Sequence, residues 1–183
     1  MSESSTPKVD PYKIFVQGHS FYQTLAVLCN VAPNNEQLAA ALTEPSIVVG
    51  ALTIELFFKC MISIESGKAS KIHDLRKLYD KLSQPTRDRI EQGWSKIAAH
   101  RGPEWDHYEQ FTGQKMARDL PTALAVGAES FERIRYSYEG GNENLQYYLQ
   151  DLPRLLGRII LAMKPDWKLP HASFVELPPF AAR

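Results

Sequence analysis

The fold is decided by the stretch PSIVVGALTIELFFKCMISIES, residues 45–66. Wound as a helix, it carries apolar side chains around nearly its whole circumference, and no turn signal interrupts it before Gly67. The Ile-Val-Val run favours a strand locally, but a segment of about 20 uninterrupted residues favours a helix. Pro45 falls in the first turn, where its missing N–H is harmless, and Gly67 is a typical C-cap. We therefore expect a long helix at the centre of the fold.

Two charged residues, Glu55 and Lys59, interrupt this apolar stretch. A membrane-spanning helix needs about 20 mostly apolar residues, and charges near its centre are costly. We therefore expect a core helix and no membrane contact. Glu55 and Lys59 stand at i and i+4 with the glutamate first, so they are expected either to form a structural ion pair or to face a ligand together.

Outward from this helix, the spacing of apolar residues predicts a bundle. Further helices are expected over residues 12–31, 36–42, 73–82, 83–99, 119–138 and 145–163. Asn35 is the expected cap of the short second segment. Residues 100–113 are expected to be mixed, with breaks at Pro103 and Gly113 and room for one short helix over residues 105–111. Pro153 is expected to kink or restart the last helix, with Asp151 as the cap. The predicted fold class is all-α, an up-and-down bundle of four to five long helices plus short ones.

The chain is expected to divide into three parts. Residues 1–11 read as a flexible N-terminus, residues 12–164 as one helical domain, and residues 165–183 as a proline-rich tail without periodicity. The N-terminus has neither the basic nor the apolar region of a secretory leader, so we expect a cytoplasmic protein.

Charge excludes one class of function. The 183 residues carry 21 Lys+Arg and 21 Asp+Glu, so bulk electrostatic attraction to nucleic acid is not expected. The neutrality is a cancellation, because the net charge is −3 over residues 1–67, +5 over 68–101, −5 over 102–151 and +3 over 152–183. A local basic face between Lys68 and Arg101 is compatible with these numbers.

The cysteines and histidines give no sign of a metal site. Cys29 and Cys60 lie among apolar residues and are expected to be buried, reduced thiols. The five histidines show no His-x-x-x-His spacing, and there is no glycine-rich phosphate loop. We expect neither a metal nor a cofactor.

Two short motifs resemble the HEPN superfamily of helical domains. Residues 51–62 read ALTIELFFKCMI and contain the pattern Ile-Glu-Leu-x-x-Lys. Residues 72–79 read IHDLRKLY and contain the pattern His-x-Leu-x-x-Leu. The arrangement of the long helices is also similar, so the resemblance covers roughly residues 12–163.

The resemblance implies a four- or five-helix bundle that forms a homodimer and acts on or binds RNA in toxin–antitoxin, phage-defence or stress systems. In the RNase members, metal-independent cleavage rests on an Arg followed, after four to six residues, by a His at a late helix. Such an Arg stabilises phosphate charge, and such a His moves the proton.

This chain departs from the RNase pattern at the matching late helix, where residues 131–142 read FERIRYSYEGGN. Arg133 and Arg135 are present, but no His follows in the required window, so the motif is lost there. A literal match occurs elsewhere, at Arg101 and His107.

Two interpretations stay open for the late helix. Its arginines have acidic neighbours three or four residues away, which is typical of a solvated helix with many ion pairs. Alternatively, Arg135 binds phosphate, Tyr136 stacks on a base and Glu139 acts as acceptor or base. Arg135 and Glu139 are then catalytic candidates, and Arg133 and Tyr136 are binding candidates.

His73 is expected to open the 73–82 helix, with Asp74 in its first turn. It either fixes the preceding loop through backbone hydrogen bonds or joins Glu55 and Lys59 in a ligand site. All three are binding candidates.

The function expected from these observations is that of an HEPN-like protein with a degenerate catalytic motif. It would bind RNA, a nucleotide or an antitoxin-like protein partner in a prokaryotic defence, stress or toxin–antitoxin context. Two alternatives stay open: an active metal-independent endoribonuclease, using Arg135 with Glu139 or Arg101 with His107, and a purely structural helical interaction module.

Overall fold

The structure, a computed structural model, describes residues 9–31, 35–134 and 146–169. These residues form helices and no strand, so the all-α prediction is confirmed. The six helices are α1 (Pro11–Val31), α2 (Glu36–Ser66), α3 (Leu75–Asp80), α4 (Gln84–Thr112), α5 (Leu120–Ile134) and α6 (Leu152–Met163).

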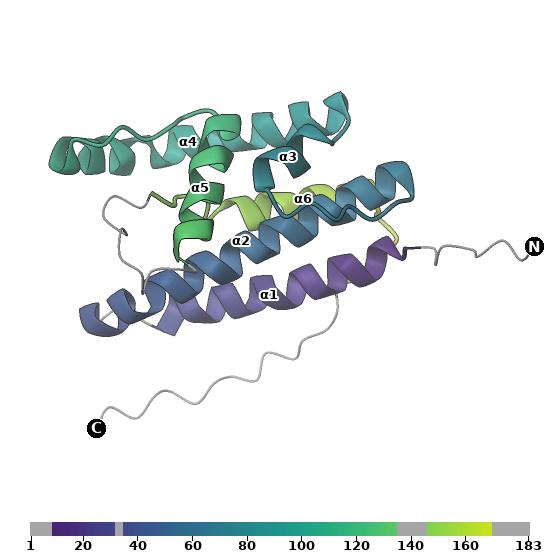
Figure 1. The fold of residues 1–183 in the computed structure, drawn as a ribbon, viewed down its shortest axis with the longest axis horizontal. Coiled ribbons are helices and arrows are strands. Elements are labelled where there is room, and N and C mark those ends of the chain that lie inside the picture. Colours follow the sequence, from purple (N-terminus) through teal and green to yellow (C-terminus); the bar gives the residue numbers. More distant parts are fainter. Residues whose placement is uncertain (1–8, 32–34, 135–145, 170–183) are drawn as a thin grey trace, which may run out of the picture.

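Helix α2 is the centre of the bundle (Figure 1). It runs antiparallel to α1 and also packs on α3, α5 and α6. Helix α4 lies on the side of the bundle opposite α1 and joins it through α5 and α6. The long apolar helix expected from the sequence therefore does occupy the core.

The hydrophobic core forms where α2 meets its neighbours. Phe57 and Phe58 on α2 are fully buried, as are Leu78 on α3 and Leu156 on α6. Away from α2, the indole of Trp94 on α4 is also buried and donates to the carbonyl of Arg118 at 2.9 Å. This bond fixes the connection between α4 and α5.

Helix α2 is longer than predicted, because residues 36–42 and 45–66 form one helix with Pro45 inside it. The prediction of two segments was wrong. Pro45 removes one backbone donor, but Asn35 caps the start by accepting from the amide of Leu38 at 2.9 Å, and Gly67 ends the helix in the left-handed conformation with φ of 69°. Both predicted caps are confirmed.

Helix α4 also runs through a proline, so the break expected at Pro103 was wrong. Residues 105–111 are helical but belong to α4, which ends at Gly113 as expected. Trp105 lies just after Pro103 in α4 and is buried. Its ring is 6.0 Å from that of Trp94, which lies earlier in the same helix. The guanidinium of Arg118 lies 5.2 Å from the ring of Trp105. Burial of this large ring stabilises the continuing helix against the one hydrogen bond that Pro103 removes.

The other boundaries differ in smaller ways. Helix α3 covers only Leu75–Asp80, since Asp74 is its N-cap and His73 precedes it. The predicted end of α5 beyond Ile134 lies outside the described residues. The last helix begins at Leu152 and not at residue 145, because residues 146–149 are not helical. Asp151 stands at the N-cap as predicted, but its side chain pairs with Arg101 and makes no capping hydrogen bond.

The two cysteines differ. Cys60 is buried, lies 3.4 Å from the carbonyl of Pro11, and has its pKa raised by burial to about 12. Cys29 is exposed, so the expectation that both are buried was wrong for this residue. Both are free thiols.

Helix α2 is long and apolar enough to cross a membrane if only its length and composition are considered. However, 61% of its most apolar window is buried within the protein. The absence of membrane contact and the cytoplasmic location stay predictions.

Candidate functional site

Three surfaces gather the polar side chains that can carry chemistry. We name them the Glu55 cluster (Glu55, Lys59 and His73), the α4 pocket (around Arg101 and His107) and the basic groove (around Lys96, Arg154 and Arg158).

The Glu55 cluster brings together three residues singled out in the sequence. One carboxylate oxygen of Glu55, Oε1, lies 2.8 Å from Lys59 Nζ and 3.0 Å from His73 Nδ1. The side chains of Glu55 and Lys59 are only 7% and 14% exposed, whereas that of His73 is 77% exposed. Glu55 therefore holds the loop before α3 onto α2, and the expected ion pair with Lys59 is present.

Beside the cluster, a groove of about 890 Å³ lies between α3 and α5. Five carboxylates and only two cations, Arg76 and Lys77, line it. Arg76 pairs with Asp80 at 3.0 Å, and Lys77 pairs with Asp74 at 3.5 Å. Carboxylates outnumber cations in this acidic groove, so it is less suited to phosphate than a basic surface is.

Of the four candidate residues on the late helix, Arg133 alone lies within the described residues. Arg133, near the end of α5, lies 3.7 Å from Glu129 in an i,i+4 ion pair. That contact is the one expected of a solvated helix. Arg135, Tyr136 and Glu139 lie outside the described residues.

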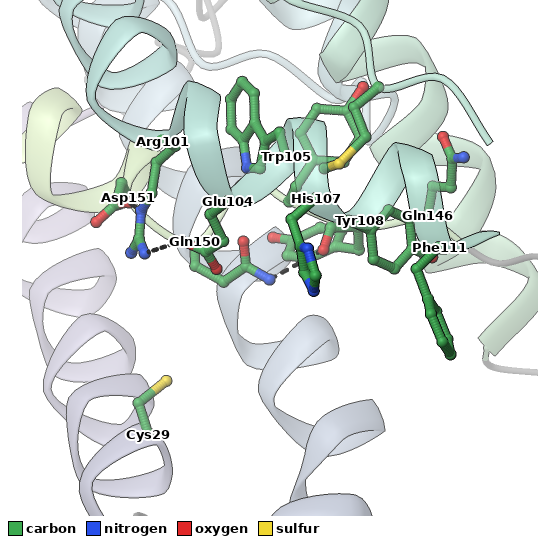
Figure 2. A pocket seen from close by; sticks show the side chains of 13 residues that line it. Cys29, Arg101, Glu104, Trp105, His107, Tyr108, Phe111, Gln146, Gln150 and Asp151 are labelled. Atoms are coloured by element: carbon green, nitrogen blue, oxygen red, sulfur yellow. Dashed lines mark hydrogen bonds and ion pairs between the residues drawn. The ribbon is translucent and has the colours of Figure 1, made fainter. Parts of the chain in front are cut away.

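The α4 pocket, of about 780 Å³, lies beneath the second half of α4 (Figure 2). Arg101 stands at one end, where it donates to Asp151 at 2.9 Å and to Glu104 at 2.7 Å. These hydrogen bonds raise the pKa of the guanidinium above its ordinary value. Figure 2 shows His107 also projecting into the pocket, farther along α4 than Arg101.

Two adjacent tyrosines close the inner side of this pocket. Tyr148 is buried, and its hydroxyl accepts from the amide of Ala117 at 2.9 Å. The Tyr147 hydroxyl is buried and has no hydrogen-bond partner among the described residues, and burial raises its pKa. A Cβ on Gly50 would lie 2.9 Å from this hydroxyl, so the ring fits because Gly50 has no side chain.

The basic groove, of about 650 Å³, lies between α4 and α6. Lys96 and His100 border it from α4, and Arg154 and Arg158 border it from α6. The helices approach closely here because the Leu155 side chain occupies the place that a Cβ on Gly93 would fill. The groove is thereby shaped by packing.

Three cations of the basic groove form no ion pair within the described part of the chain. Lys96, Arg154 and Arg158 are all exposed, and none forms an ion pair with a residue that the structure describes. The one carboxylate in the lining, Asp151, is already paired with Arg101. The arginines stand at i and i+4, where like charges repel by about 0.2–0.5 kcal/mol. The arrangement suits an anionic ligand.

Sequence reasoning missed the basic groove. It noted a possible basic face over residues 68–101, but Arg76, Lys77 and Arg101 in that range are paired with carboxylates. The available signal was the spacing of Arg154 and Arg158 in an amphipathic segment with no acidic residue between them.

The fold and its surfaces define an all-α helical bundle with a basic groove between two of its helices. No protein-family profile, curated protein or solved structure matches this chain. The HEPN resemblance therefore stays a prediction.

Proposed function

We propose that this chain is an HEPN-like protein that binds RNA along the basic groove without cleaving it. The observation that supports the proposal most directly is the set of three exposed cations, Lys96, Arg154 and Arg158, facing one groove without ion-pair partners among the described residues. Phosphate groups would relieve their mutual repulsion and release counterions. Because the whole chain is neutral, this local charge would govern binding.

Two features of the chain favour binding without cleavage. The matching late helix of the sequence has no His after its arginines. In the α4 pocket, the guanidinium of Arg101 is already bound by two carboxylates, those of Asp151 and Glu104. We therefore expect RNA to be bound without cleavage.

The test is a binding titration with a labelled RNA of about 12 nucleotides. Replacing Lys96, Arg154 and Arg158 together by Ala is expected to weaken binding about 100-fold at 0.1 M salt, since each lost contact with a single strand forfeits about 0.7 of a counterion. The matched control replaces Lys68, Lys71 and Arg89, which are exposed and change the net charge equally.

The control variant is expected to bind within about threefold of the unsubstituted protein, because it retains every groove contact. Equal weakening of both variants would show that net charge, and not the groove, governs binding. Absence of salt-dependent RNA binding would instead favour the structural interaction module.

The alternative of an active endoribonuclease is supported by one observation, that Arg101 and His107 border the same pocket. Incubating RNA with the protein in a metal chelator tests it. We expect intact RNA. Cleavage that disappears in Arg101→Ala or His107→Ala, or in Arg135→Ala, would replace the binding proposal with the endoribonuclease.

The remaining expectations follow from the HEPN resemblance, except the cytoplasmic location, which was expected from the N-terminal sequence. A homodimer, a nucleotide ligand, an antitoxin-like partner, a cytoplasmic location and a defence or toxin–antitoxin setting all stay predictions. A sedimentation measurement of mass tests the homodimer directly.

A further inference from the structure

The last two turns of α4 carry three aromatic side chains on the outside of the protein. His107 is exposed, Tyr108 is 39% exposed, and Phe111 is 86% exposed. Residues three and four apart are neighbours on a helix, so Phe111 adjoins both other rings. Figure 2 shows Phe111 and His107 projecting from the same side of α4. We name these three residues the aromatic strip.

The aromatic strip continues from the basic groove. The Arg101–Asp151 pair borders both the groove and the α4 pocket, whose lining includes all three rings. Along α4, Lys96, His100, His107 and Phe111 fall within about 60° of one another around the helix axis and span about 22 Å. On this face of α4, the basic side chains of Lys96 and His100 are therefore followed by the aromatic rings of His107 and Phe111.

The two surfaces offer complementary chemistry. The groove presents positive charge, which binds phosphate regardless of sequence. The strip presents flat rings, which stack on bases only when those bases are unpaired, because a duplex encloses them. An exposed phenyl ring beside a basic groove thus fits a polyanion that carries aromatic groups.

We infer that the basic groove and the aromatic strip form one track for single-stranded RNA, with phosphates at Lys96, Arg154 and Arg158 and unpaired bases stacked on Tyr108 and Phe111. The inference rests on the proposed RNA binding and adds the form of the RNA and the side chains that select it. Charge complementarity favours this occupant, because the groove presents three exposed cations that form no ion pair with the described residues, and a single strand supplies a phosphate at every nucleotide.

The test compares a single-stranded RNA with a duplex containing the same strand. The single strand is expected to bind at least tenfold more tightly. Phe111→Ala is expected to weaken single-strand binding about tenfold, because stacking of one base is worth on the order of a tenfold change or more. The duplex affinity is expected to stay unchanged in this variant.

Two further substitutions separate stacking from apolar contact. Phe111→Trp retains a stacking ring and is expected to bind as the unsubstituted protein does, whereas Phe111→Leu is expected to bind as weakly as Phe111→Ala. Val27→Ala, at an apolar side chain 37% exposed on α1, is the control and is expected to change nothing. Since Phe111 is 86% exposed, these variants are expected to fold normally.

Several outcomes would overturn the inference. Equal affinity for duplex and single strand, or full binding by Phe111→Leu, would do so while leaving the proposed RNA binding intact, provided the groove variant still loses affinity. A shift of oligomeric state in Phe111→Ala, with unchanged RNA affinity, would assign the strip to a contact between copies. Failure of every RNA to bind would overturn both proposals.

Discussion

The Glu55 cluster and the basic groove differ in whether their charged side chains form ion pairs. In the cluster, a nearly buried carboxylate is bound by a lysine and a histidine, and the cations of the adjoining groove have carboxylate partners. In the basic groove, three exposed cations form no ion pair with the described residues. Buried charge must be paired for the chain to fold, whereas exposed unpaired charge is available to a ligand. We therefore expect the cluster to be structural, and the groove is the better candidate for binding.

The largest expected effect is on stability at the Glu55 cluster. Glu55→Ala is expected to lower the free energy of unfolding by about 3 kcal/mol, because it leaves the mostly buried Lys59 without its partner. Urea denaturation measures this change. A loss below about 1 kcal/mol would contradict the structural role.

A control sharpens this prediction. Replacing Glu55 by Leu and Lys59 by Met together removes both charges and fills a similar volume. The double variant is expected to recover most of the lost stability, since an apolar pair can replace a buried ion pair at little cost. If it were as unstable as Glu55→Ala, the contact with His73 would be the important one.

A smaller effect is expected at Arg101, which borders both the α4 pocket and the basic groove. Arg101→Ala is expected to cost less than about 1 kcal/mol, because Arg101 and Asp151 are 39% and 37% exposed and solvent screens their attraction. Thermal unfolding tests this expectation. A loss of 2 kcal/mol or more, on the scale of a buried pair, would place Arg101 with the structural residues instead of the surface ones.

The smallest expected effect is an increase in stability, caused by a substitution at Arg158. Arg158→Ala is expected to raise the free energy of unfolding by about 0.2–0.5 kcal/mol, because it removes the i,i+4 repulsion with Arg154. The gain should shrink at high salt, which screens exposed charges. Urea denaturation at two salt concentrations measures it, and destabilisation by this substitution would show that Arg158 has a stabilising partner.

Local patterns in the sequence were sufficient to predict much of the fold. The apolar circumference of residues 45–66 predicted the central helix, and Gly67 was correctly predicted as its C-cap. Asn35 was predicted to cap a separate short helix, and it caps this same helix instead. The i,i+4 spacing predicted the Glu55–Lys59 contact. The prolines at 45 and 103 were misleading, because packing of buried side chains outweighs the loss of one hydrogen bond, and such packing depends on distant residues.

The candidate site was less predictable because its parts come from separate segments. Contact between His73 and Glu55 depends on the course of the loop before α3, which no local pattern specifies. The basic groove joins Lys96 with Arg154 and Arg158, more than 50 residues later in the chain. The unpaired charge of this groove depends on which neighbouring cations form ion pairs, and the sequence does not specify those pairs.

The central claim is tested most directly by the salt dependence of RNA binding. The logarithm of the association constant, plotted against the logarithm of salt concentration, is measured for the unsubstituted protein and for the variant lacking Lys96, Arg154 and Arg158. The slope is predicted to become shallower by about 2, since three phosphate contacts with a single strand contribute about 0.7 each. An unchanged slope would contradict the proposal that these residues bind the phosphates.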